Sequence, residues 1–138
     1  MSFQRELAVA RDNGILPIVL VGDIYPVAVG GRYISKTDSR LFGIKASNID
    51  PKFRRSLRSY ASQHDLDIST LTYHERGSPH DNTGAVYWFP AKDKGRVSVE
   101  IEEIRRRQHD VRLRHQIIEM EGAMLGYPEC CIGAYIDD

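Results

Sequence analysis

The spacing of apolar residues in the first part of the chain predicts one helix followed by short strands. Phe3 to Asn13 has the amphipathic pattern of a helix, and Asn13-Gly14 is a typical stop signal at its end. Ile15 to Val21 and Pro26 to Val29 are short apolar runs that predict two strands. A third and weaker strand is predicted over Arg40 to Ala46.

The middle of the chain predicts a second helix and a pair of strands. Asp50-Pro51 is a strong helix start, because Asp caps free amides and Pro suits the first helical position, and this helix runs toward His64. Leu66 to His74 and Gly84 to Phe89 are typical of strands, joined by a polar loop from Glu75 to Thr83.

The longest helical pattern extends from Ser98 to Leu125. Its apolar residues form two adjoining stripes, so we expect its second half to be largely buried and its first half to be solvated. Gly126 ends this helix, and Pro128 begins a short one. We therefore expect residues 1–138 to form a single α+β domain with a small mixed or antiparallel sheet, a long C-terminal helix and a short Cys-bearing helix.

The composition is that of an ordinary soluble domain, with 41% apolar and 28% charged residues in a chain of 138. The longest apolar run, Ile15 to Val21, is too short to span a bilayer, so the sequence predicts no membrane segment. The N-terminus, from Met1 to Glu6, mixes charges and lacks the apolar stretch of a signal peptide. We therefore expect a cytoplasmic protein in a reducing compartment.

The formal net charge is zero, which removes the general electrostatic argument for nucleic-acid binding. Arginines nevertheless cluster on two predicted helices, at Arg54, Arg55 and Arg58 and at Arg105 to Arg107. These clusters suit an acidic protein or RNA, but without interleaved aromatic residues a solvated helix face is the plainer interpretation. No Lys or Arg follows Arg114, so the cysteines lie at the acidic end of the chain.

Cys130 and Cys131 are the two cysteines of the chain, and as neighbours they make a poor structural disulfide. Pro128 places them in the first turn of a helix, where free amides and the helix dipole lower the pKa of a thiol. Tyr127 is a poor capping residue, so these amides are free for a ligand, and we take Tyr127 and Glu129 as ligand-binding candidates. The alternative is that both cysteines are small buried hydrophobic residues.

His115 and Glu119 are four residues apart, which puts them on one face of the predicted helix. Together with Cys130 they make a mixed set of ligands for a transition-metal ion. Nearby carboxylates favour a bound cation over a free thiolate, because their negative charges attract the cation and raise the pKa of a thiol. The set lacks the spacing of known zinc motifs, and a core histidine with a surface carboxylate is the plainer interpretation.

A second candidate site is the loop around His74 and His80. There a His base and an orienting carboxylate such as Asp81 would transfer a proton or bind a ligand, although a polar loop is the plainer interpretation. Asp23 follows a predicted strand and is interpreted as a turn former. Gly30-Gly31 lacks the spacing of a phosphate-binding loop and is interpreted as a hairpin turn.

The segment Leu125-Gly126-Tyr127-Pro128-Glu129-Cys130-Cys131, preceded by Glu119-Met120-Glu121-Gly122-Ala123-Met124, carries a resemblance to a known family. It is similar to the signature of a prokaryotic, largely archaeal family of unknown function that is marked by Gly-Tyr-Pro-x-Cys-Cys. The resemblance covers about the last quarter of the chain. It implies that the two cysteines and the preceding helix form a shared site, and it implies no particular reaction.

These observations lead to one functional hypothesis and one alternative. We expect a small cytoplasmic enzyme, or an enzyme subunit, that acts on a small molecule or peptide through Cys130 or Cys131, with His115 and Glu119 as metal ligands or proton carriers. The alternative is a non-catalytic accessory module that presents its arginine-rich helices to a protein partner or RNA. Because the chain ends seven residues after Cys131, we expect a second copy or a larger protein partner to complete the site.

Overall fold

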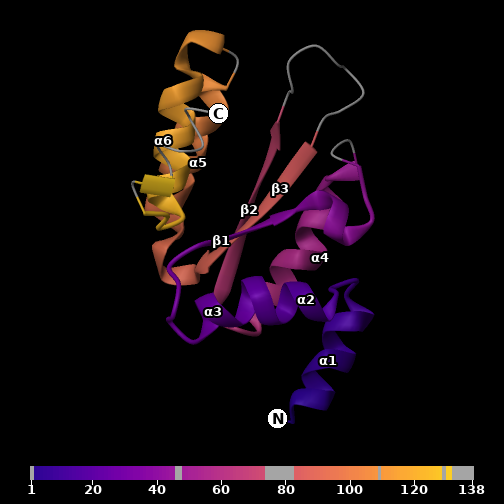
Figure 1. The fold of residues 1–138 in the computed structure, drawn as a ribbon. Helices are drawn as coiled ribbons and strands as arrows, with labels where there is room; N and C mark the ends of the chain where they lie inside the picture. Colours follow the sequence, from indigo (N-terminus) through magenta and orange to yellow (C-terminus); the bar gives the residue numbers. More distant parts are fainter. Residues whose placement is uncertain (1, 46–47, 74–82, 109, 129, 132–138) are drawn as a thin grey trace.

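The computed structural model of the chain describes residues 2–45, 48–73, 83–108, 110–128 and 130–131. Among these residues, three strands form one antiparallel sheet in the order β1-β3-β2. The strands are β1 (Ser35–Asp38), β2 (Leu66–Tyr73) and β3 (Thr83–Pro90). Helices pack on both faces of this sheet (Figure 1), so the chain is a single α+β domain as predicted.

The central strand β3 is apolar on both sides because it is covered on both sides. Its residues Ala85 to Phe89 are all buried. Val86 and Trp88 belong to one core and Ala85, Tyr87 and Phe89 to the other, which is the alternation that strand geometry imposes. The sheet therefore separates two apolar cores.

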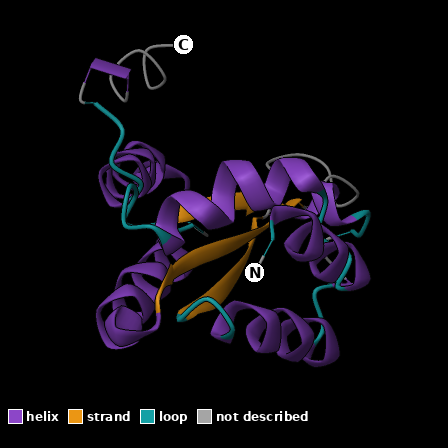
Figure 2. Cartoon of the chain, turned by 90° about the horizontal axis from the view of Figure 1, so that it is seen from below, coloured by secondary structure: helices purple, strands orange, loops and turns teal. Residues whose placement is uncertain are grey.

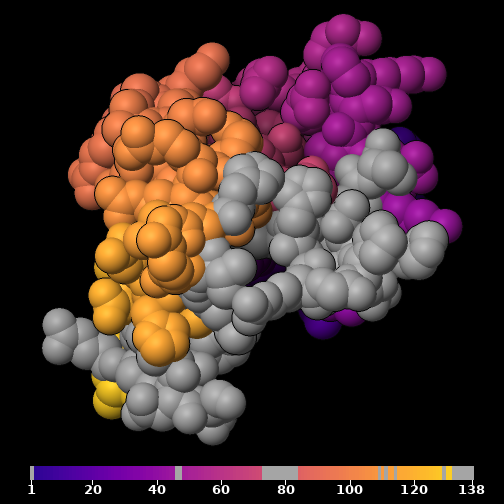
Figure 3. Space-filling model, turned by 90° about the horizontal axis from the view of Figure 1, so that it is seen from above, coloured from indigo at the N-terminus to yellow at the C-terminus, as the bar shows by residue number. Residues whose placement is uncertain are grey.

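Each core is closed by its own layer of helices. The first layer consists of α1 (Phe3–Asp12), α2 (Pro17–Val19), the π-helical turn η1 (Leu20–Ile24), α3 (Tyr25–Ala28) and α4 (Pro51–Ser62). The second layer consists of α5 (Lys94–Arg107) and α6 (Arg114–Met124). From below, the strands lie between helices (Figure 2), and from above the α5–α6 layer and the segment from β1 to α4 form opposite sides of the molecule (Figure 3). Among the described helices, none is long and apolar enough to cross a membrane.

Elements with clear local signals form as predicted. The predicted first helix is α1, and its N-cap Ser2 accepts a hydrogen bond from the Arg5 amide. Asp50 caps α4 by accepting from the Phe53 amide at 2.8 Å, and Pro51 is the first residue of this helix. The two strands predicted in the middle of the chain are β2 and β3, with ends that differ by a single residue.

The predicted strands at Ile15 to Val21 and Pro26 to Val29 are wrong, because both segments are largely helical. Pro17 is the first residue of α2, a position that suits its fixed φ and its missing amide hydrogen. The run is apolar on all sides, and such a pattern does not distinguish a buried strand from a buried helix. Gly30 has φ +80 and follows α3, so it does not form the predicted hairpin turn.

A π turn interrupts this helical run just before Pro26. Pro26 has no amide hydrogen to donate to the carbonyl four residues earlier. The amide of the preceding residue, Tyr25, donates to the carbonyl of Leu20, five residues earlier, which is the π-type bond. The helix continues through the proline because the wider turn accommodates it. Asp23 lies inside this π turn, so its interpretation as a turn former between strands is also wrong.

Two further elements differ from the sequence prediction. The strand predicted over Arg40 to Ala46 is wrong, because its first residues belong to the 3-10 helix η2 (Ser39–Phe42). The strand in this region is β1, which the sequence does not predict because its residues are polar. Ala46 itself lies outside the described residues. The predicted helix from Ser98 to Leu125 is divided into α5 and α6, because Asp110 accepts from the Arg112 amide at 2.9 Å and so starts a new helical segment.

A chain of hydrogen bonds joins the first layer to the sheet. Trp88 Nε1 donates to Thr37 Oγ1 at 2.9 Å, and the Thr37 hydroxyl donates to Asp23 Oδ2 at 2.6 Å. Burial raises the pKa of Asp23, although the hydrogen bond from Thr37 and the charge of Arg32 act in the opposite direction. The structure thus accommodates a half-buried carboxyl group that is more easily ionised in the unfolded chain.

Replacing Asp23 with Asn removes this charge and keeps an oxygen that accepts from Thr37. Because the pKa of Asp23 is raised in the folded state, its contribution to stability is present at low pH and is lost as the pH rises above the unfolded value of 3.8. We expect Asp23→Asn to be more stable than the wild type at pH 7, with a much smaller gap near pH 3. Urea unfolding at both pH values measures this, and a variant that is less stable at pH 7 would contradict it.

Candidate functional site

The segment that carries the cysteines begins at the glycine that the sequence predicts as the end of α6. Gly126 has φ +77, a left-handed conformation that favours glycine. The Tyr127 amide donates to the Gly122 carbonyl at 2.9 Å, and the Gly126 amide donates to the Ala123 carbonyl at 3.1 Å. These bonds form a Schellman-type cap, which ends the helix before Pro128.

Cys130 and Cys131 are free thiols, and both are exposed, so their interpretation as buried hydrophobic residues is wrong. Both are helical, and the Cys131 amide donates to the Pro128 carbonyl at 3.0 Å. Their Sγ atoms are 4.0 Å apart and share a hydrogen bond. This bond, together with the charge of a Cys130 thiolate, raises the pKa of Cys131, so the expected lowering is wrong for this thiol.

The other predicted site residues lie apart from the cysteines or outside the described residues. His115 and Glu119 share α6 with the predicted spacing, and both are exposed. Within the described residues, no group of three His, Cys, Asp or Glu side chains could hold a metal ion, so His115, Glu119 and Cys130 do not form such a group. Tyr127 is also exposed. Outside the described residues lie Glu129, His74 and His80.

Glu121 of α6 contacts two strands of the sheet, and sequence reasoning missed these contacts. Its Oε1 accepts from Lys36 Nζ at 2.5 Å, and its Oε2 accepts from the Tyr87 hydroxyl at 3.0 Å. Lys36 belongs to β1 and Tyr87 to β3, so one side chain of α6 binds two strands. Because these residues are distant in the sequence, no local spacing could have revealed the contact.

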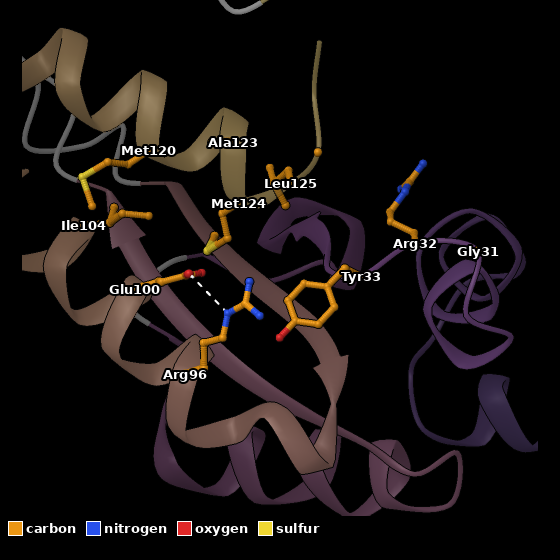
Figure 4. Close-up of a pocket in the computed structure, with 11 residues that line it drawn as sticks. Gly31, Arg32, Tyr33, Arg96, Glu100, Ile104, Met120, Ala123, Met124 and Leu125 are labelled. Atoms are coloured by element: carbon orange, nitrogen blue, oxygen red, sulfur yellow. Dashed lines mark ion pairs between the residues drawn. The ribbon is translucent and has the colours of Figure 1, made fainter. Parts of the chain in front are cut away.

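A groove of about 710 Å³ lies between α5, α6 and the segment that precedes β1 (Figure 4). Met120 and Met124 line it from α6, and Ile104 lines it from α5. Leu125 and Gly126 extend its wall toward the cysteine segment. The volume lies in the range of small-molecule sites, which is about 300–1,000 Å³.

Polar side chains line one end of this groove. The guanidinium of Arg96 lies 5.0 Å from the ring centre of Tyr33, and it pairs with Glu100 at 3.8 Å (Figure 4). The Tyr33 hydroxyl oxygen is buried, and no group among the described residues meets the distance and angle of a hydrogen bond with it. Burial raises the pKa of Tyr33, and the neighbouring carboxylates of Asp93 and Glu100 act in the same direction, so this hydroxyl keeps its proton at neutral pH.

The arginines of α5 are engaged within the protein. Arg105 donates to the Thr70 carbonyl of β2 at 2.6 Å. Arg106 and Arg107 both pair with Glu103, at 2.5 Å and 3.0 Å. These contacts support the interpretation of a solvated helix face, and a surface for RNA or an acidic protein stays a prediction.

No protein family model, curated protein or solved structure matches this chain. The resemblance based on the segment before Cys131 therefore stays a prediction. Because a fold alone does not determine a reaction, the function has to be inferred from the thiols and the groove.

Glu121→Ala should destabilise the domain by about 1–3 kcal/mol, because it leaves the amine of Lys36 and the buried hydroxyl of Tyr87 without this acceptor. Glu119→Ala is the matched control, since Glu119 is exposed on the same helix, and its effect should stay within about 0.5 kcal/mol. Chemical denaturation of the three proteins measures the difference. Equal effects of the two variants would show that Glu121 does not hold α6 to the sheet.

Proposed function

We propose that the protein is a small enzyme, or an enzyme subunit, that acts on an organic molecule through the vicinal thiols of Cys130 and Cys131. The observation that carries this proposal is the exposure of both sulfur atoms at a separation of 4.0 Å. A buried free cysteine serves as a small hydrophobic side chain, whereas an exposed one gains little from packing and is open to reagents. This supports a chemical role for the pair.

The two thiols have different roles in this proposal. Either sulfur could donate the hydrogen bond between them, and because the pKa of Cys131 is raised by its neighbour, we assign the S–H donor to Cys131. Cys130 is then the sulfur that accepts this hydrogen bond. The thiolate is the nucleophilic form, so we assign the attack on the substrate to Cys130 and the retained proton to Cys131.

The groove, which Gly126 lines four residues before Cys130, supports a place for the substrate. Gly126 forms part of its wall, and Cys130 follows within about 14 Å of extended chain. Ile104 and Met120 offer apolar contacts, and the guanidinium of Arg96 offers hydrogen-bond donors. These features suit a small molecule with an apolar body and a hydrogen-bond acceptor.

The assigned roles predict asymmetric effects on the reactivity of the thiols. In Cys130→Ala, Cys131 loses the neighbour that raises its pKa, so its alkylation at pH 8 should be faster than in the wild type. In Cys131→Ala, Cys130 loses its hydrogen-bond donor, and its alkylation should be slower than in the wild type. Cys131→Ser keeps a hydroxyl donor and should retain most of the rate. Iodoacetamide labelling with peptide mass spectrometry measures these rates.

Equal labelling rates at Cys130 in the wild type, Cys131→Ala and Cys131→Ser would contradict the assigned roles. Metal analysis of the protein purified under reducing conditions tests the other use of the same thiols. Bound metal together with thiols that resist labelling would replace the nucleophilic role by a ligand role. Circular dichroism of each variant checks that the fold is retained, as expected for exposed side chains.

A further inference from the structure

The helical run from Pro17 to Ala28, formed by α2, η1 and α3, is apolar on two opposite sides. The inner side is buried in the first core and consists of Val19, Leu20, Ile24 and Val27. The outer side is open to solvent, with exposed fractions of 68% for Ile18, 51% for Val21 and 79% for Val29. A helix that is apolar all round is normally covered on both sides.

The exposed residues form two neighbouring rows. Ile18, Gly22 and Pro26 follow one another at intervals of four residues, as do Val21, Tyr25 and Val29, and residues with this spacing stack on one side of a helix. None of the six is fully buried, although the π turn rotates the side chains that follow it relative to those that precede it. Phe3 of α1 extends the surface, because its ring centre lies 6.2 Å from that of Tyr25. We call these seven residues, together with exposed Leu16, the outer face.

No charge interrupts the outer face. Between Asp12 and Arg32 the sequence holds one charged residue, Asp23. Its carboxylate turns inward and accepts the hydrogen bond from Thr37 at 2.6 Å. The part of the outer face that comes from Leu16 to Val29 therefore carries no outward charge, and it gathers several apolar residues where scattered single ones are normal on a protein.

We propose that the outer face binds the same face of a second copy of this chain in a two-fold symmetric dimer. In such a dimer each face meets itself, so a charged face repels its copy, whereas an uncharged apolar face is complementary to itself. Charged residues are depleted at the centre of homodimer interfaces for this reason. Gly22 lies in the middle of the outer face, and a Cβ there would meet no atom within 4 Å, which allows two helices to approach closely.

A lipid surface is a poorer match for the outer face. Helices that lie on membranes combine an apolar side with a polar side rich in Lys and Arg. The segment from Asn13 to Gly31 contains neither residue type, and its opposite side is buried on the sheet. A second copy needs no such basic residues.

The size of the outer face sets the expected strength of the dimer. The helical run is about 18 Å long and about 10 Å wide, so its footprint of about 180 Å² is well below the roughly 800 Å² that each partner of a stable interface buries. We therefore expect a weak, transient dimer with a dissociation constant in about the range of tens to hundreds of micromolar.

Sedimentation equilibrium of the full chain over a range of concentrations tests this dimer. The wild type should change from 15.7 kDa to twice that mass, and Ile18→Glu should raise the dissociation constant at least about tenfold, because it places two charges in the interface. Val99→Glu is the matched control, since Val99 is 65% exposed on α5, outside the outer face, and it should dimerise like the wild type. Circular dichroism verifies that both variants are folded.

A cross-link identifies the face that is used. In Gly22→Cys, made together with Cys130→Ser and Cys131→Ser, the new thiols should meet across the two-fold axis and form a disulfide-linked dimer under mild oxidation. The proposal is overturned by a wild type that stays monomeric at hundreds of micromolar, or by an Ile18→Glu variant that dimerises as well as the wild type. It is also overturned if the dimer fails to cross-link at position 22, or if the monomer sediments with phosphatidylcholine–phosphatidylserine vesicles in an Ile18-dependent way.

Discussion

The burial of β3 on both sides is the constraint on which the rest of the structure depends. Ala85 to Phe89 presents apolar side chains in both directions, so a single layer of helices cannot shield this strand from water. The N-terminal half of the chain covers the Val86 and Trp88 side, and α5 and α6 cover the side of Tyr87. α6 lines one side of the groove and leads into the cysteine segment, so their place in the molecule also depends on β3.

The sequence predicts the elements whose signals are local and fails where the signals are ambiguous. Asp50 and Pro51 together predict the start of α4, because Asp50 caps the helix and Pro51 suits its first position. Pro17 holds the same position in α2, but Leu16 before it makes no side-chain cap, and the surrounding residues are apolar on every side. Strand and helix then fit the pattern equally well, and only the packing against the sheet decides between them.

The same distinction separates the predictable and unpredictable parts of the site. Gly126 and the thiol pair are found from the sequence because a helix end and two adjacent cysteines are visible within a few residues. Glu121 has its partner Lys36 at a distance of 85 positions along the chain, so its importance appears only in the folded protein. The pKa of Cys131 departs from expectation because another thiol, rather than a helix amide, is its main neighbour.

The strand order β1-β3-β2 has a consequence for the time course of folding. β3 comes last in the sequence but lies in the centre, and each of the other two described strands pairs with it alone. During synthesis, none of these strand pairs can form until the chain has left the ribosome as far as Pro90. Until then β1 and β2 lack the strand that joins them, and neither core has its central side chains. The arrival of β3 therefore completes the sheet and the first core together, whereas the second core is complete only after α5 and α6 have followed.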